Sequence, residues 1–393
     1  MKKKILFVME SLRIGGAEKS LVTILSLLDK GKYDIELYLF RQEGEFLEQV
    51  PEGVKLLPIS DIDAMQKNFK TDWITYLKSG KIKRSFYSFK WLLGCCISKY
   101  VGHREEYIGW NNSTHLYSDI PGEYDVAIGF LEKKASYFIV DHVNAKKKAA
   151  FIHIDYTQAG YTRQLDRDCY TKFDAVFPIG ENVEKKFLEV YPECKSYTHV
   201  FHNVINQDMI RRKAKSYGGF SDNYDGIRIL TVGRLTPQKS YPTAIATMEK
   251  LKKAGFKARW YVLGEGPERS NLEKQIEQAG LTEDFLLLGA VDNPYPYFAQ
   301  TDLYVHATMF EGKSIAIQEA QTLGCAIVAS DSNEEQITDG VDGFVRPLKP
   351  EALAKAILQL AGNAKMRETF GKAAMQRTVT YEEDKKLLDN LLR

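Results

Sequence analysis

Two glutamates separated by seven residues form the sharpest chemical signal in the sequence. They occur in Phe310-Glu-Gly-Lys-Ser-Ile-Ala-Ile-Gln-Glu319, directly after a short apolar run. Gly312 permits a turn, and Ser314 is suited to cap a helix that begins after it. Glu311 would then precede this helix, and Glu319 would lie in its second turn. Such a pair can hold two parts of an elongated polyhydroxy ligand, while backbone N–H groups between them can meet a phosphate.

Two basic residues follow another apolar run, in Thr231-Val-Gly-Arg-Leu-Thr-Pro-Gln-Lys-Ser240. Arg234 can contact a diphosphate through a planar two-pronged contact and Lys239 as a point charge. Pairs of basic residues on a loop are usually just solvated, so this spacing leaves both interpretations open. The nearby Gly264-Glu-Gly266 matches half of a dinucleotide fingerprint, lacks its third glycine, and is typical of a plain turn.

The N-terminal half offers two weaker candidates. Gly15-Gly16 separates a strand-like run from a helical one, where backbone N–H groups can approach a phosphate. His153-Ile-Asp155-Tyr156 ends the apolar run Lys148–Ile154. A lone histidine is more often structural, but polar residues at the end of a buried strand favour a site.

Metal and disulfide chemistry find little support. Asp61 with Asp63, and Asp166 with Asp168, are interpreted as chance surface pairs. The five cysteines show no Cys-x2-Cys spacing, are odd in number, and fit a reducing cytoplasm. No metal site is predicted.

Short apolar runs alternate with longer amphipathic stretches, which predicts βαβ units and parallel sheets. The series starts at Lys3–Met9, and it restarts at Arg228–Val232 after a polar stretch, Asn206–Gly226. The fold class is therefore α/β, with two tandem Rossmann-like, doubly wound domains. Ligands of such sheets bind at the carboxyl ends of the strands, where the candidate residues lie.

One segment, about 62–116, interrupts the alternation. Between residues 67 and 104 it holds nine Lys or Arg and one acid, so a net charge of +2 conceals a local +8. Aromatic residues interleave with these bases, which favours an interfacial helix on an anionic membrane. A solvated face over an ordinary core helix and a nucleic-acid contact fit the same composition, and we predict no nucleic acid. No apolar run is long enough to span a membrane, and the start predicts a buried strand rather than a signal peptide.

In this order, the motifs resemble the retaining glycosyltransferases of family four, of the bacterial surface-polysaccharide type. Gly15-Gly16-Ala-Glu18, His153-Ile-Asp-Tyr156, Phe201-His-Asn-Val-Ile205 and Val232-Gly-Arg-Leu235 match in turn, followed by the Glu-x7-Glu signature. The resemblance implies the GT-B architecture, with a cleft between two Rossmann-like domains. It also implies an acceptor-binding domain at 1–205, a donor-binding domain at 206–375, and a C-terminal helix at 376–393 that could pack back on the first.

The resemblance assigns Arg234 and Lys239 to the diphosphate of a UDP- or GDP-sugar, Glu319 to its ribose and Glu311 to its sugar. His153 would lie near the sugar and the acceptor, and the predicted acceptor-binding residues are His153, Asp155 and Tyr156. Many members carry another sequence where this chain has Gly312-Lys-Ser-Ile315, so the identity of the sugar stays open. The predicted catalytic residues are His153, Arg234, Lys239 and Glu311. The predicted donor-binding residues are Gly15, Gly16, Gly233, Arg234, Lys239, Gly264, Val291, Glu311, Gly312, Lys313, Ser314, Ile315 and Glu319.

We therefore predict a cytoplasmic, metal-independent glycosyltransferase without a cofactor, held on the inner face of the membrane. It would transfer one sugar to a lipid-linked or cell-surface polysaccharide precursor. The resemblance implies retention, with the leaving phosphate helping to deprotonate the acceptor. Two alternatives remain: a nucleotide-sugar epimerase of the same architecture, which would turn over without an acceptor, and a silent binding module, which would not turn over. An NAD dehydrogenase lacks its glycine fingerprint here.

Overall fold

The computed structural model describes residues 2–13, 15–59, 69–101, 110, 114–159, 161–377 and 382–393. It divides into two compact units. Unit 1 comprises Met1–Arg13, Ala17–His202 and Glu382–Arg393, and unit 2 comprises Asn203–Tyr381 together with Ile14–Gly16. The division falls after residue 202, rather than after residue 205 as expected from the sequence.

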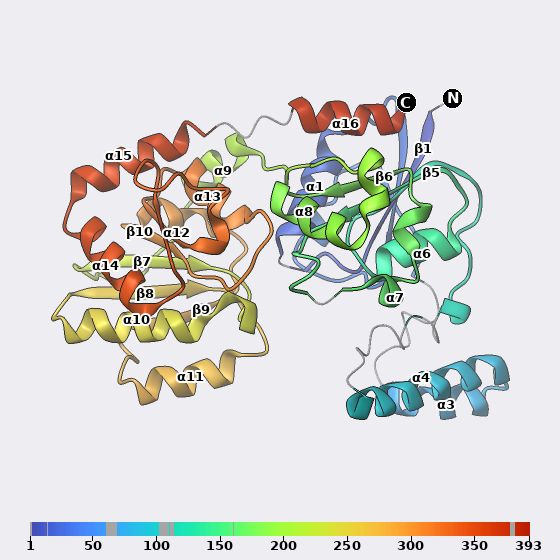
Figure 1. The fold of residues 1–393 in the computed structure, drawn as a ribbon, viewed down its shortest axis with the longest axis horizontal. Coiled ribbons are helices and arrows are strands. Elements are labelled where there is room, and N and C mark those ends of the chain that lie inside the picture. Colours follow the sequence, from blue (N-terminus) through green and yellow to red (C-terminus); the bar gives the residue numbers. More distant parts are fainter. Residues whose placement is uncertain are drawn as a thin grey trace. The chain divides into compact units, whose positions relative to one another are not determined.

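Unit 1 is built on six parallel strands in the order β3-β2-β1-β4-β5-β6 (Figure 1). The strands are β1 (Lys3–Met9), β2 (Tyr33–Leu39), β3 (Val54–Leu56), β4 (Tyr124–Gly129), β5 (Ala145–Ile152) and β6 (Ala175–Pro178). The helices are α1 (Gly16–Leu27), α3 (Phe69–Lys78), α4 (Ile82–Val101), α6 (Lys134–His142), α7 (Arg163–Asp166), α8 (Glu181–Val190) and α16 (Glu382–Leu392).

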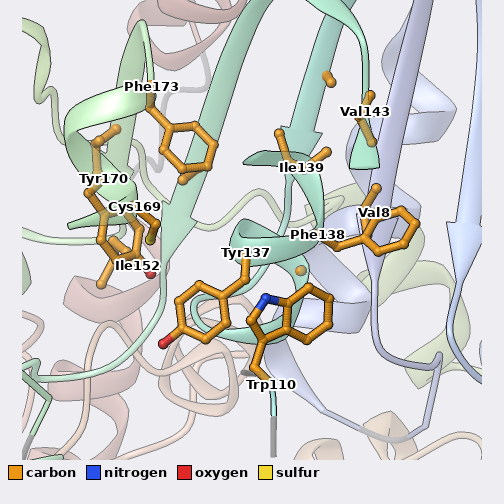
Figure 2. Close-up of a cluster of buried hydrophobic side chains, with 14 of the residues drawn as sticks. Val8, Trp110, Tyr137, Phe138, Ile139, Val143, Ile152, Cys169, Tyr170 and Phe173 are labelled. Carbon is orange, nitrogen blue, oxygen red and sulfur yellow. The ribbon is translucent and has the colours of Figure 1, made fainter. Parts of the chain in front are cut away.

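The core of unit 1 is rich in aromatic side chains. Figure 2 shows part of this cluster, in which Tyr137 of α6 lies beside Trp110, with ring centroids 6.0 Å apart. Tyr38 stacks on Phe138 with ring centroids 4.9 Å apart. Offset aromatic pairs of this kind bury large apolar areas and favour defined geometries, so they hold the helices on the sheet that positions the strand ends.

Helices α3 and α4 form a hairpin within the predicted basic and aromatic insertion. Ser85 Oγ donates to the carbonyl oxygen of Trp73 at 2.7 Å, and the rings of Trp73 and Phe89 meet edge to face. Residues 60–68, 102–109 and 111–113 of this region, with the predicted pair Asp61 and Asp63, lie outside the described residues. Among the described helices, none is both long and apolar enough to cross a membrane.

The C-terminal helix α16 packs in unit 1. Lys3 Nζ donates to the carbonyl oxygen of Leu392 at 3.0 Å, and Lys147 Nζ to that of Leu391 at 3.1 Å. Asp384 accepts a bond from the His202 N–H at 2.8 Å. Lysine side chains near a helix C-terminus satisfy its last carbonyl groups, so these contacts fix the end of α16 against the sheet.

Unit 2 has six parallel strands in the order β12-β11-β10-β7-β8-β9. The strands are β7 (Ile227–Val232), β8 (Ala258–Leu263), β9 (Phe285–Gly289), β10 (Leu303–His306), β11 (Ile327–Ser330) and β12 (Phe344–Arg346). The helices are α9 (Gln207–Ala214), α10 (Tyr241–Lys253), α11 (Arg269–Gln278), α12 (Tyr295–Gln300), α13 (Ile315–Thr322), α14 (Pro350–Ala361) and α15 (Ala364–Met375).

Both faces of this sheet are buried, because neighbouring residues of each strand point to opposite faces. Ile229 and Trp260 belong to one apolar cluster, with residues of α10 and α14. Leu230 and Tyr261 belong to another, with residues of α9, α12 and α13. The predicted α/β class with two parallel sheets is thus confirmed.

Two strands were not predicted. Both β3 and β12 are three residues long, and both lie at an edge of their sheet. Edge strands are often short and partly exposed, so their sequences show no clear apolar run. Strand β1 spans the predicted Lys3–Met9, and β7 begins one residue before the predicted Arg228–Val232. Strand β5 begins three residues before the predicted Lys148–Ile154 and ends two residues before it.

Candidate functional site

The carboxyl end of β10 leads into the loop that carries Glu311. The Glu311 carboxylate accepts bonds from Lys239 Nζ at 2.6 and 2.8 Å, and it lies 2.7 Å from His306 Nε2. Burial by itself would raise the pKa of Glu311, but Lys239 and His306 outweigh it and hold the pKa at about 2. The first glutamate of the predicted pair is therefore a fixed, ionised carboxylate.

His306 is the last residue of β10 and is 1% exposed. Its pKa lies below the ordinary value because of burial, and also because of Lys239, although Glu311 acts in the opposite direction. We therefore assign a neutral ring that donates from Nε2 to Glu311 and accepts the Tyr304 hydroxyl at Nδ1, across 2.9 Å. Tyr304, His306 and Glu311 form one directed chain of hydrogen bonds.

Lys239 reaches Glu311 from the loop after β7. This loop is joined to the Glu311 loop by two bonds: the Met309 N–H donates to the Gln238 carbonyl oxygen at 2.9 Å, and Gln238 Nε2 donates to the Phe310 carbonyl oxygen at 2.8 Å. The structure thus brings two predicted residues, Lys239 and Glu311, into contact. Arg234 lies on the same loop as Lys239, with its side chain exposed.

Gly264 allows the loop after β8 to lie against the loop after β7. It adopts a φ of +153°, and a Cβ there would lie 2.0 Å from the carbonyl oxygen of Gly233. The Leu235 N–H also donates to the Glu265 carbonyl oxygen at 2.9 Å. Glycine is required here for close backbone approach, so both Gly264 and Gly233 shape the strand ends. Val291, which follows β9, is partly buried against a core cluster.

Glu319 lies in the second turn of α13 and is 3% exposed. The Tyr295 hydroxyl on α12 donates to Glu319 Oε1 at 3.1 Å. Burial, together with this carboxylate, raises the pKa of Tyr295, which therefore stays protonated as the donor. Tyr295 fixes one oxygen of the second predicted glutamate.

The start of α13 differs from the prediction. Ser314 occupies the capping position, but its side chain makes no capping bond. Gln336 instead holds the backbone of Ser314: its Oε1 accepts from the Ser314 N–H at 2.6 Å, and its Nε2 donates to the Ser314 carbonyl oxygen at 2.9 Å. One of the N–H groups expected to meet a phosphate is therefore already bonded. Lys313 is held nearby, since Asn203 Nδ2 donates to its carbonyl oxygen at 3.2 Å.

His153 lies one residue beyond the end of β5 in unit 1. Its N–H donates to Glu132 Oε2 at 3.0 Å, and burial lowers its pKa to about 3 against the effect of a bond to the Phe130 backbone. In the part of the chain that the structure describes, its buried Nε2 has no hydrogen-bond partner. A buried polar atom without a partner is uncommon, so His153 remains a candidate.

The two residues predicted beside His153 have structural roles. Asp155 is 1% exposed, and its Oδ1 accepts bonds from Thr157 and Gln158 that close a local turn. Tyr156 is fully buried, and its hydroxyl donates to Asp166. An acceptor contact by Tyr156 does not fit this position in the core.

Asp166 was wrongly interpreted as a surface residue. It is 1% exposed and accepts bonds from the hydroxyls of Tyr137, Tyr156 and Tyr191. Burial raises its pKa, and the three hydroxyls offset only part of that effect. In the described part of the chain, no group of three or more His, Cys, Asp or Glu side chains could hold a metal ion.

Sequence reasoning missed His306, Tyr304, Tyr295 and Gln336, which hold the two glutamates and the loop between them. A polar residue at the end of a buried strand was a usable signal for His306, and it was applied only to His153. Gln318 was also missed: it is 2% exposed, and both of its amide atoms lack a partner among the described residues. No local sequence pattern predicts the roles of Tyr295 and Gln336, because their hydrogen-bond partners are distant in sequence.

Comparison with known proteins agrees with this geometry. Residues 221–377, which make up most of unit 2, match the family described as "Glycosyl transferases group 1". Unit 2 is therefore a glycosyltransferase domain, and the predicted resemblance to glycosyltransferases is confirmed.

Particular relatives extend the match. The amylovoran biosynthesis glycosyltransferase AmsD of Erwinia amylovora is 22% identical over 388 residues, covering 93% of this chain and 92% of that protein. A Campylobacter jejuni enzyme is 26% identical over 226 residues, covering 56% of this chain and 60% of its own length. Its name is N-acetylgalactosamine-N,N'-diacetylbacillosaminyl-diphospho-undecaprenol 4-alpha-N-acetylgalactosaminyltransferase. The match to the Bacillus subtilis poly(glycerol-phosphate) alpha-glucosyltransferase spans only 30% of that protein, at 24% identity and 53% of this chain.

Solved structures establish the fold. HepE of Anabaena, in complex with UDP and glucose, superposes with a TM-score of 0.70 at 17% identity and covers 99% of both chains. A structure of S. aureus TarM that contains UDP superposes with a TM-score of 0.67 at 14% identity, and the match covers 100% of both chains. The chain has the GT-B fold of these glycosyltransferases, as predicted.

Proposed function

We propose that the chain is a retaining glycosyltransferase that moves one sugar from a nucleotide-diphosphate sugar to a lipid-linked or cell-surface polysaccharide precursor. The observation that carries this proposal is the contact of Lys239 with Glu311, ordered by His306, at the strand ends of a glycosyltransferase domain. One fixed cation beside one fixed carboxylate suits a ligand with an anionic part and a hydroxylated part.

Each side chain has a proposed role. Arg234 and Lys239 contact the diphosphate, Glu319 accepts bonds from the ribose hydroxyls, and Glu311 accepts bonds from the hydroxyls of the donor sugar. Of the remaining residues of the predicted donor set, Gly233, Gly264, Val291 and residues 312–315 follow strands of unit 2, whereas Gly15 and Gly16 follow β1. His153 faces the sugar and the acceptor, and its low pKa keeps the ring neutral.

The reaction follows from these charges. Breaking the bond between the sugar C1 and the diphosphate oxygen creates an oxocarbenium-like centre, while negative charge grows on the leaving phosphate. In the proposed reaction, Lys239 and Arg234 stabilise that charge without a metal ion. Because Glu311 already holds Lys239, the ammonium is oriented before the charge develops. The leaving phosphate then takes the acceptor proton on the face where the new bond forms, which gives retention.

The donor and the acceptor are proposed from the relatives. HepE is bound to UDP and glucose, and to UDP-glucose in another complex, so we propose a UDP-sugar rather than a GDP-sugar. The C. jejuni name contains a diphospho-undecaprenol acceptor and the E. amylovora name a polysaccharide pathway. We propose an acceptor of that class, and attachment of the enzyme to the inner face of the membrane through the basic region 67–104.

The test has a binding step and a transfer step. UDP-sugars are screened for a rise in the unfolding temperature, because a ligand that binds only the folded state stabilises it by mass action. The stabilising donor is then incubated with lipid extracts, and sugar incorporation is measured for the wild type and for R234A and E319A. Full transfer by either variant would contradict the assigned site. Donor turnover without any acceptor would instead identify an epimerase, and binding without turnover a silent module.

A further inference from the structure

An apolar stripe on α4 is left exposed by the fold of unit 1. Its members recur at spacings of four, three and four residues, which places them on one face of a helix. They are Ile82, Phe86, Phe89 and Leu93, with exposed fractions of 71%, 61%, 45% and 50%. Leu77 of α3 is also 52% exposed. Neighbouring apolar residues at this exposure are unusual on a soluble surface and mark an interaction site.

The hairpin has an inner side that is already packed. Tyr76 is 3% exposed and Ser85 is 5% exposed, and the Ser85 hydroxyl bonds to the backbone of Trp73. Tyr87 packs against the aromatic core of unit 1. The stripe is therefore a second apolar face of α4. Phe89 at one edge of it also meets the ring of Trp73 within the hairpin, whereas Ile82, Phe86 and Leu93 are at least half exposed.

The charge around the stripe has one sign. Residues 73–93 contain five basic side chains and no acid. Lys83 and Lys90 each follow a stripe residue by one position, about a quarter turn around the helix. Lysine side chains beside an apolar stripe can extend their ammonium groups to anionic headgroups while their stems stay with the apolar face.

We propose that the α3–α4 hairpin docks on an anionic lipid bilayer, with α4 in the plane of the interface and its stripe buried below the headgroups. This inference rests on the proposed function and extends it, because it names apolar insertion as the means by which the enzyme reaches a lipid-linked acceptor. A second copy of the chain is a poorer occupant, since pairing two such hairpins would bring like charges together. Membrane binding by charge alone is abolished by high salt. Insertion of the stripe adds an apolar contribution to membrane binding, which high salt does not remove.

The first experiment measures partition of the full chain into vesicles, without donor or acceptor. Vesicles of phosphatidylcholine with phosphatidylglycerol are compared with vesicles of phosphatidylcholine alone, at low and high salt. We expect F86S and F89S each to lower the partition coefficient about tenfold in the anionic vesicles, at both salt concentrations. The matched control is Y217S, which removes a fully exposed aromatic side chain of unit 2 and should leave partition unchanged. Replacement of Lys81, Lys83 and Lys90 by Gln should lower binding mainly at low salt.

The second experiment measures directly whether the stripe enters the lipid bilayer. It uses a tryptophan in place of Phe86, which keeps an aromatic side chain, so it does not depend on the folding of the serine variants. The chain has four native tryptophans, including Trp73 and Trp91 of the hairpin, so the wild-type signal is subtracted. The emission that F86W adds should be quenched by lipids brominated in their acyl chains, whereas the emission that Y217W adds should not. Partition of F86S/F89S equal to the wild type, or no quenching of F86W, would overturn the proposal. So would loss of a dimer in F86S/F89S with unchanged vesicle binding.

These outcomes separate the two proposals. A chain that binds vesicles but transfers no sugar contradicts the proposed function and leaves the docking surface in place. A chain that transfers sugar to a water-soluble acceptor but ignores vesicles contradicts the docking surface alone.

Discussion

The two sheets of this molecule share one strand order but carry different chemistry at their strand ends. The orders β3-β2-β1-β4-β5-β6 and β9-β8-β7-β10-β11-β12 are equivalent. In unit 2 the strand ends present an ion pair between Lys239 and Glu311, whereas in unit 1 the residues after β5 are a neutral histidine and a buried tyrosine. Fold and site are thus separable: the same sheet carries an ion pair at its strand ends in one unit and a neutral histidine after β5 in the other.

The largest expected effect tests whether the charged strand ends perform the chemistry. K239A should lower kcat by roughly 10²- to 10³-fold, because it removes a preorganised cation from the leaving diphosphate. Single-turnover and steady-state kinetics with the identified UDP-sugar measure the change. The control is K253A, an exposed lysine of α10 paired with Glu249, which should keep wild-type kcat. If K239A retains kcat, then the charge difference between the two sheets has no catalytic meaning.

A smaller effect is expected at His306, which touches no substrate in the proposed site. H306F should raise KM about tenfold with a lesser change in kcat, because Glu311 loses one of the two groups that orient its carboxylate. It should also lower the free energy of unfolding by about 1–3 kcal/mol, since the Tyr304 hydroxyl loses its partner. H306N, whose amide can still donate a hydrogen bond to Glu311, should show a smaller rise in KM than H306F. A role limited to stability would change unfolding and leave KM untouched.

The two units should also respond to acid in opposite directions. The pKa of Glu311 in the folded chain is about 2, below its ordinary value of 4.5. Its contribution to stability is therefore present above pH 4.5 and is lost as the pH falls toward 2, by at most about 3 kcal/mol. Burial raises the pKa of Asp166 above its ordinary value of 3.8. As the pH rises above 3.8, the need to ionise Asp166 in the core therefore lowers the free energy of unfolding.

Denaturant unfolding of each variant between pH 3 and pH 6 measures this contrast. E311Q should flatten the increase in stability with pH, whereas D166N should make that increase steeper. The wild type carries both effects and should lie between the two. Equal slopes in all three chains would show that neither carboxyl group contributes to the dependence.

The sequence predicted what depends on local pattern. Strands buried on both faces appear as continuous apolar runs, so β1 was placed without error, whereas the edge strands β3 and β12 were missed. Glu311, Glu319, Arg234 and Lys239 were found through their spacing and their resemblance to a family. Contacts across long sequence separations left no such signal, which is why Gln336 and Tyr295 were not predicted.

The smallest effect concerns the start of α13. The sequence predicted a cap by the Ser314 side chain, whereas the structure shows Gln336 bonded to the Ser314 backbone. Helices α9 and α13 of unit 2 both begin after a residue of the capping type, Asn206 and Ser314. Asn206 caps α9 by accepting a bond from the Met209 N–H at 2.9 Å, so N206A should cost about 1 kcal/mol of stability. Ser314 makes no such bond, and its own N–H is instead held by Gln336. S314A should therefore change the free energy of unfolding by less than about 0.5 kcal/mol. Q336L should cost more than N206A, because it leaves the buried Ser314 N–H unpaired, whereas the Ser314 carbonyl oxygen keeps its bond from the Gln318 N–H. Urea unfolding of the three variants checks this order. If S314A costs as much as N206A, then its hydroxyl caps the helix in solution and the clamp by Gln336 is secondary.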